Sequence, residues 1–148
     1  MTWEVSINRD ERTLAGLAHG SIVLGLFTNG VGGILAALVI WLTQREKSAY
    51  VGAQALQALG YQAIVFAVTM TAWCCWGALW MVLIFAPLLA QPVSEEAMLA
   101  GMWGGMLLMV LPLSLWAVTI LYGLWGAVRC LGGHDFKYLV IGNLLENR

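Results

Sequence analysis

A short charged elbow between two long apolar regions is the feature that most constrains how this chain folds. Arg45, Glu46 and Lys47 follow an apolar run that ends at Trp41, and a second apolar helix is expected to open at Ser48. The chain is 61% hydrophobic and 10% charged, with a mean hydropathy of +0.82, whereas about a quarter of the residues in soluble domains are charged. The sequence therefore predicts an all-α integral membrane protein.

Residues 13–43, before the elbow, are expected to form a short helical hairpin. This apolar region is interrupted at residues 28–33 by Thr-Asn-Gly-Val-Gly-Gly, and a single span needs only about 20 residues. We expect one helix over residues 9–27, about 28 Å long, and a second over 31–43, about 20 Å long. The second is shorter than the roughly 30 Å hydrocarbon core, so the hairpin either spans barely or re-enters from one side.

Two long helices are expected after the elbow, which covers residues 44–50. The first, residues 51–85, is too long for one crossing, so its beginning should lie at the interface and its span should begin near Tyr61. An external loop, residues 86–96, separates it from a spanning helix over 97–130. Together with the hairpin these make four helices in a single domain that covers the whole chain.

Helix terminators support these boundaries. Pro87 and Pro92 bracket the loop, and Ser94 offers an N-cap to a first turn that holds Glu95 and Glu96. Pro112 should kink the last helix, because a proline cannot donate to the carbonyl one turn earlier. The pair Gly132–Gly133 should end that helix.

The distribution of bases predicts the orientation. With a hairpin, every Lys and Arg falls on one side of the membrane, as expected of a cytoplasmic side, and Arg45 and Lys47 are the bases that set this topology. We therefore expect a multi-pass protein of the bacterial cytoplasmic (inner) membrane. Residues 1–12 and the tail, residues 131–148, should both be cytoplasmic, and no signal peptide is indicated.

The tail should form a short interfacial segment. It is too short and too polar to span, so Phe136, Tyr138 and Leu139 should face the membrane or the bundle.

Small residues predict sites of close helix packing. Gly16 and Gly20 lie four residues apart, as do Gly101 and Gly105, so each pair puts two glycines on one helix face. The sequence leaves open whether they pack within this chain or against another subunit.

A polar stripe predicts the main interaction surface. Tyr50, Gln54, Gln57 and Tyr61 recur on one face of a helix, with Gln62 beside it. Carboxamides near a bilayer are costly unless paired. The stripe therefore serves either as a structural contact between helices or as the lining of a polar groove or partner surface.

Two features are weak candidates for cofactor binding. His19 lies in an apolar segment, where it could be a hydrogen-bonded packing residue, a metal ligand of a haem or pigment, or a proton relay. Trp73, Trp76 and Trp80 form an aromatic ridge, which is either a packing or lipid-facing surface or a contact for a quinone or pigment. No cofactor is predicted outright, and lipid is the expected ligand.

Other classes of function find little support. Only 7 Lys and Arg are present and the net charge is −1, which argues against a nucleic-acid partner. No catalytic constellation or metal-ligand spacing occurs, so we expect no enzyme and no metal site. Cys74, Cys75 and Cys130 lack a C-x-x-C spacing and are interpreted as buried, inert thiols.

Three segments carry a resemblance to a known family. They are E-R-T-L-A-G-L-A-H-G-S at 11–21, I-W-L-T-Q-R-E-K-S-A-Y-V-G-A-Q-A-L-Q-A-L-G-Y-Q at 40–62 and G-G-H-D-F-K-Y-L-V-I-G at 132–142. The chain resembles a family of small bacterial membrane proteins of unknown function, described as similar to the four-helix subunit of the protein-import translocon of the chloroplast inner envelope. The resemblance covers nearly the whole chain. It implies a four-helix membrane protein connected with protein translocation or with the assembly of membrane complexes.

These observations lead to one functional expectation and two alternatives. We expect a non-catalytic accessory or scaffolding subunit of a larger membrane complex, with lipids and other membrane subunits as partners. The alternatives are a component of protein translocation or membrane-protein assembly, and a binder of quinone or pigment within the bilayer.

Overall fold

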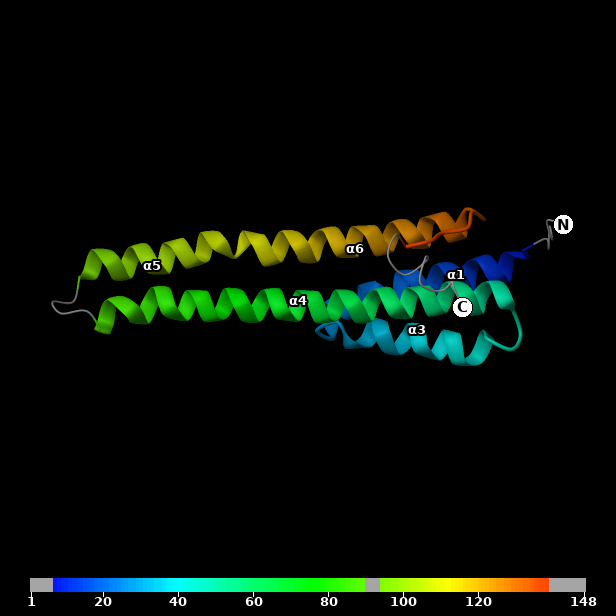
Figure 1. Cartoon of the computed structure of the whole chain (residues 1–148). Coiled ribbons are helices and arrows are strands. Elements are labelled where there is room, and N and C mark those ends of the chain that lie inside the picture. Colours follow the sequence, from blue (N-terminus) through cyan, green and yellow to red (C-terminus); the bar gives the residue numbers. More distant parts are fainter. Residues whose placement is uncertain (1–6, 90–93, 139–148) are drawn as a thin grey trace. The chain divides into compact units, whose positions relative to one another are not determined.

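The computed structural model describes residues 7–89 and 94–138, and these residues form helices and turns without a strand. The helices are α1 (Arg9–Gly20), a 3-10 turn η1 (Ser21–Val23), α2 (Leu24–Phe27), α3 (Val31–Gln44), α4 (Ala49–Leu89), α5 (Glu95–Leu108) and α6 (Val110–Leu131) (Figure 1). The first three segments form one rod, and α5 and α6 form another. The predicted fold is confirmed: a short N-terminal hairpin is followed by two long helices.

Several predictions concern residues outside the described part of the chain. These are the first residues of the N-terminal segment 1–12, Pro92 in the loop, and the tail beyond Tyr138, including Leu139.

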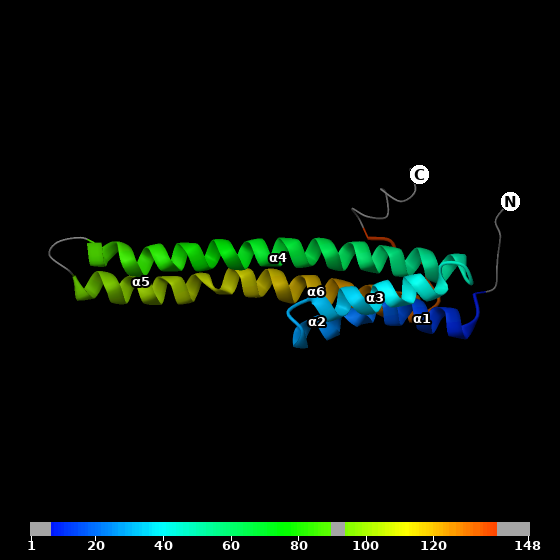
Figure 2. The same cartoon turned by 90° about the horizontal axis from the view of Figure 1, so that it is seen from below.

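The hairpin turn lies at the predicted glycine-rich break. Asn29 and Gly30 have φ angles of 50° and 91°, and the left-handed region is readily adopted by Gly and tolerated by Asn. The Gly30 N–H donates to the carbonyl of Gly25 at 2.8 Å, and the Thr28 hydroxyl oxygen accepts the N–H of Gly32 at 2.8 Å. These bonds cap α2 and open α3, so the chain reverses here (Figure 2).

Asn8 and Ser48 fix the beginnings of α1 and α4. Asn8 and Glu11 form a capping box, in which each side chain accepts the other residue's backbone N–H. The Ser48 hydroxyl accepts the N–H of Val51 at 3.2 Å and donates to Glu11 Oε1 at 2.7 Å. One serine therefore caps α4 and ties it to the first turn of α1.

Helix α4 extends beyond its predicted end. It continues through Pro87 to Leu89, so residues 86–89, predicted as loop, are helical. Pro87 cannot donate to the carbonyl of Leu83, and a Cβ built on Gly101 of α5 would meet that same Leu83 carbonyl oxygen. The glycine thus lets α5 approach the carbonyl that the proline leaves without a helical donor.

The last helical stretch, residues 95–131, is interrupted close to Pro112, which was predicted to kink it. Helix α5 begins after the Ser94 cap, whose hydroxyl oxygen accepts the N–H of Ala97 at 3.3 Å. It ends at Leu108, and α6 begins at Val110. Pro112 lies in the first turn of α6, where it has no N–H for the carbonyl of Leu108. The interruption at Met109 is the local result.

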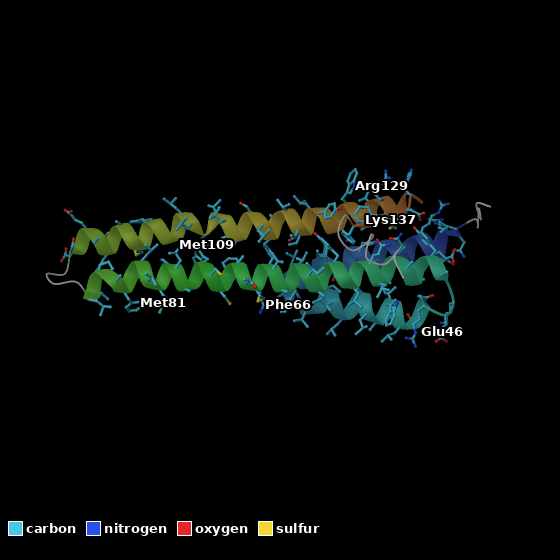
Figure 3. The ribbon with its side chains drawn as sticks, in the orientation of Figure 1. Glu46, Phe66, Met81, Met109, Arg129 and Lys137 are labelled. Carbon is cyan, nitrogen blue, oxygen red and sulfur yellow. The ribbon has the colours of Figure 1, made fainter. Side chains whose placement is uncertain are left out.

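Gly133 ends α6 in a Schellman motif. Its φ angle is +78°, its N–H donates to the carbonyl of Cys130, and the N–H of His134 donates to the carbonyl of Arg129, both at 3.0 Å. Arg129 in the last turn of α6 and Lys137 beyond the motif are labelled in Figure 3.

Contacts divide the chain into two compact units. The first comprises Met1–Phe66 and Thr119–Arg148, and the second Ala67–Val118. Figure 3 marks Phe66 at the boundary, and Met81 and Met109 within the second unit. Each unit is described by itself below.

The first unit has small and polar residues inside and large apolar residues outside. Ala18, Ala37, Ala55 and Ala58 pack together where α1, α3 and α4 meet. Outside, large apolar side chains are exposed, and Phe27 reaches 82%. Soluble domains show the reverse pattern, so this outer surface suits a lipid environment.

Among the described residues, two helical stretches are long and apolar enough to cross a membrane. They are α4 and the stretch Glu95–Leu131, which comprises α5 and α6. Helix α4 has 41 residues, and at 1.5 Å per residue it is about 61 Å long, about twice the hydrocarbon core.

Candidate functional site

His19 is the centre of a buried polar network in the first unit. Its side chain is fully buried on α1. Nδ1 lies 2.9 Å from the hydroxyl of Tyr138, and Nε2 lies 3.0 Å from Oε1 of Gln54 on α4. An amide oxygen only accepts, so Nε2 carries a proton, and in the neutral ring Nδ1 then accepts the tyrosine O–H. Both ring nitrogens are therefore engaged.

Gln54 joins α1 to α6 through a single oxygen. Its side chain is 4% exposed, and Oε1 accepts both His19 Nε2–H and the thiol of Cys130, whose sulfur lies 3.6 Å away. A carbonyl oxygen has two lone pairs, so it can accept both donors. Removal of this side chain would leave two buried donors without their acceptor.

Gln62 forms a second polar contact between α4 and the hairpin. Its Nε2 donates to the carbonyl of Ala18 at 3.1 Å and to the hydroxyl of Ser21 at 3.0 Å. The Ser21 hydroxyl lies 2.8 Å from the carbonyl of Ala18 and 3.1 Å from that of Gly33. A Cβ on Gly33 would collide with Gln62 Oε1, so only glycine allows α3 this close to the glutamine.

The remaining members of the predicted stripe also face inward. Tyr61 donates to the carbonyl of Thr119 at 2.7 Å. Tyr50 packs against the cluster that contains Ala15 and Cys130. Gln57 is 7% exposed, and its Oε1 has no hydrogen-bond partner among the described residues. The structure thus places all five stripe residues toward the interior of one unit.

Sequence reasoning missed several members of this network. Ser21 and Tyr122 were not singled out, and Cys130 was considered only as an inert thiol. Phe136 and Tyr138 were expected to face either the membrane or the bundle, and both face the bundle, with 7% and 2% exposed. The sequence did carry a signal for this placement. Two aromatic residues follow the glycine terminator of the helix, and such residues can fold back and pack on that helix.

The glycine pairs pack within the chain. A Cβ on Gly16 would lie 2.6 Å from the side chain of Leu131, and one on Gly20 would lie 3.7 Å from Ala127, both on α6. In the second unit, Gly101 faces the Leu83 carbonyl and Gly105 faces the ring of Trp80. Both motifs therefore bring helices of this chain together.

The tryptophan ridge belongs to the second unit. Trp76 forms an edge contact with Trp73 at 5.5 Å and stacks on Trp80 at 5.1 Å, between ring centroids. Its indole N–H donates to the carbonyl of Gly105 at 2.9 Å. The indole nitrogen of Trp80 is buried without a hydrogen-bond partner among the described residues.

An apolar groove of about 290 Å³ lies beside this ridge. It runs between α4 and the α5–α6 rod, and its lining comprises Ala72, Cys75, Trp76, Leu79, Leu108, Leu111, Pro112 and Leu115.

Cys74 and Cys75 are exposed, which corrects the expectation that they are buried; Cys130 is buried as expected. The reason is that the second unit is built from few helices, so much of the surface of α4 there has no helix against it.

The elbow residues remain at the surface. Arg45 lies 3.6 Å from Glu46 in an exposed ion pair, and its guanidinium carbon lies 5.2 Å from the ring centroid of Trp41. Such pairs contribute little to stability. The predicted role of Arg45 and Lys47 in setting topology stays a prediction.

The fold and the buried network define the class of protein. This is a small helical membrane protein, with an apolar outer surface and a first unit whose helices are joined by buried polar side chains. The chain belongs to the magnetosome magnetite crystal formation protein family, whose sequence model matches residues 10–145.

The family match confirms the predicted membership of a small bacterial membrane-protein family, and it supplies no link to the chloroplast translocon. Searches of curated proteins and of solved structures each found no match.

Proposed function

We propose that this chain is a non-catalytic membrane protein that takes part in magnetite crystal formation in the magnetosome membrane. The observation that carries the proposal is the family match over residues 10–145, nearly the whole chain. The two rods long and apolar enough to span a bilayer support a location in the membrane. The role is that of an accessory subunit, which acts through its surfaces on the crystal or on other subunits.

The buried network supports a structural rather than a chemical role for His19. Both of its ring nitrogens are hydrogen-bonded within the chain, so a metal could bind only after one of these bonds is broken. The histidine therefore joins helices, and the functional surfaces lie outside the network.

Charge suggests which end of the long helices meets the crystal. The bases Arg45 and Lys47 precede α4, while Glu95 and Glu96 occupy the first turn of α5, after α4 has ended. If the bases are cytoplasmic, the exposed acidic turn faces the compartment in which the mineral grows. Carboxylate oxygens suit hard metal ions, so this end is suited to the mineral surface.

Gene deletion in a magnetite-forming bacterium tests the proposal. We expect smaller or irregular crystals by electron microscopy, restored by the intact gene on a plasmid, and recovery of the protein in purified magnetosome membranes. Crystals of normal size and shape, with the protein confined to other membranes, would contradict it.

A partner experiment tests the accessory role. Purification from magnetosome membranes in mild detergent should recover other membrane subunits in fixed ratio. A stable monomer, free of other chains, would argue that the protein acts alone.

The apolar groove favours a second candidate function, binding of a quinone through its tail. Its volume of about 290 Å³ is at the low end of ligand pockets, about 300–1,000 Å³, so a chain-like group suits it better than a haem or chlorophyll ring. Purified protein should then carry a quinone detectable by absorption and mass spectrometry, and its absence would remove this candidate.

A further inference from the structure

Residues 134–138 form a non-helical segment, the strap, that folds back along α6. The Schellman motif at Gly133 reverses the chain. Beyond it, the ring of Phe136 packs against Gly126, where an added Cβ would lie 2.8 Å from the ring. Two residues later, Tyr138 lies beside Tyr122, with ring centroids 5.5 Å apart. The strap therefore runs back over the last three turns of its own helix.

Tyr138 connects the strap to three helices. Its hydroxyl bonds to His19 of α1 at 2.9 Å. Its ring stacks on Tyr61 of α4 at 4.0 Å and 7°, and meets Tyr122 of α6 edge-on. Phe136 adds edge contacts to His19 and to Tyr138 itself.

The strap covers the polar interior of the first unit. His19 and Cys130 are fully buried, and Gln54 is 4% exposed. Tyr138 and Phe136 contact the His19 ring directly, and Cys130 packs in the same cluster as both. A short segment without helical hydrogen bonds of its own opens more readily than the helices beneath it.

We propose that the strap is a latch. Closed, it seals His19, Gln54 and Cys130 inside the first unit; open, it exposes their nitrogen, oxygen and sulfur atoms while α1, α4 and α6 stay folded. The Gly132–Gly133 turn is the hinge, and the hydroxyl of Tyr138 is the catch. This inference does not rest on the proposed role in crystal formation, because its test is made on purified protein.

The buried thiol of Cys130 is the natural reporter. In a full-length chain carrying Cys74→Ala and Cys75→Ala, Cys130 is the remaining cysteine. Its rate of reaction with N-ethylmaleimide in mild detergent then measures how often the latch opens, because a buried thiol reacts only from the open state.

Tyr138→Phe tests the catch. The variant keeps the stacked ring and removes the hydroxyl, which leaves Nδ1 of His19 buried without its donor. We expect labelling of Cys130 to speed up about tenfold, the factor that corresponds to about 1.4 kcal/mol. Gly126→Ala should act in the same direction, because its Cβ displaces Phe136.

Two controls separate the latch from general loosening. His134→Ala changes an exposed side chain on the strap itself and should leave the rate unchanged. Gly105→Ala crowds Trp80 in the second unit; it should lower the melting temperature without speeding the labelling of Cys130.

The proposal is overturned if Tyr138→Phe and Gly126→Ala label at the parent rate. It is equally overturned if labelling follows the melting temperature across all variants, including Gly105→Ala, since Cys130 would then react only from the unfolded chain. Circular dichroism at the labelling temperature confirms that Tyr138→Phe and Gly126→Ala remain helical during the assay.

Discussion

At the scale of single residues, the first unit depends on a few buried polar side chains that form hydrogen bonds between its helices. His19 and Gln54 join α1, α4, α6 and the strap through bonds of 2.9 to 3.6 Å. A buried polar group in an apolar bundle is stabilising only while its partners are present. Loss of one partner would therefore leave a buried polar group unpaired.

Replacement of His19 should be costly. His19→Ala removes the partner of the Tyr138 hydroxyl and one of the two donors to Gln54 Oε1, and it leaves a cavity. We expect the free energy of unfolding to fall by about 2–4 kcal/mol. Leu17→Ala on the exposed face of the same helix should change little. The midpoint of SDS-induced unfolding in detergent micelles measures both; equal midpoints would show that the network contributes nothing.

Glu11 makes the junction of α1 and α4 sensitive to acid. The hydrogen bond from the Ser48 side chain, followed by that from the Asn8 backbone N–H, holds the pKa of Glu11 below its ordinary value of 4.5. A lowered folded-state pKa stabilises the folded chain above pH 4.5, and this contribution is lost as the pH falls through the lowered value.

The midpoint of SDS-induced unfolding should therefore decrease in the parent chain as the pH is lowered below 4.5. It should decrease less in Glu11→Gln and Ser48→Ala. An identical acid response in all three chains would show that the Ser48–Glu11 bond does not form in solution.

At the scale of elements, glycines decide where helices approach one another. Gly105 receives the ring of Trp80, whereas Gly104 beside it has nothing within 4 Å of an added Cβ. The two positions thus form a matched pair on one helix.

Gly105→Ala should destabilise the second unit by about 1–3 kcal/mol through overpacking, while Gly104→Ala should be neutral or stabilising by up to about 1 kcal/mol through helix propensity. Tryptophan fluorescence during unfolding reports on the packed ridge. Equal stability of the two variants would contradict the close approach of Trp80 to Gly105.

The sequence was informative about elements and less so about their partners. The break at residues 28–33 located the hairpin, and the spacing of Tyr50, Gln54, Gln57 and Tyr61 predicted one polar stripe, because both are local patterns. The sequence left open whether the stripe contacts other helices of the chain or lines a groove or partner surface. His19 and Tyr138 are 119 positions apart, and no periodicity connects them. The extension of α4 through Pro87 escaped prediction because the freed Leu83 carbonyl is met by Gly101 from another helix.

At the scale of the whole molecule, this member of the magnetite crystal formation family has Arg45 and Lys47 before α4 and Glu95 and Glu96 in the first turn of α5. On the positive-inside rule we propose an orientation with cytoplasmic bases. A reporter fused to the N-terminus should read cytoplasmic, and one inserted between α4 and α5 should read on the opposite side. If both reporters lie on the same side of the membrane, the proposed topology is wrong.

The most direct test of the central claim is crystal size in a deletion strain that carries variant genes. Glu95→Gln/Glu96→Gln removes the acidic turn that we place toward the mineral, and Glu46→Gln removes one acid at the elbow before α4. We predict that the parent gene and Glu46→Gln restore normal crystals, while the double variant, present in equal amount, leaves them small or irregular. Normal crystals with the double variant would contradict the proposed orientation. Normal crystals in the deletion strain itself would contradict the proposed function.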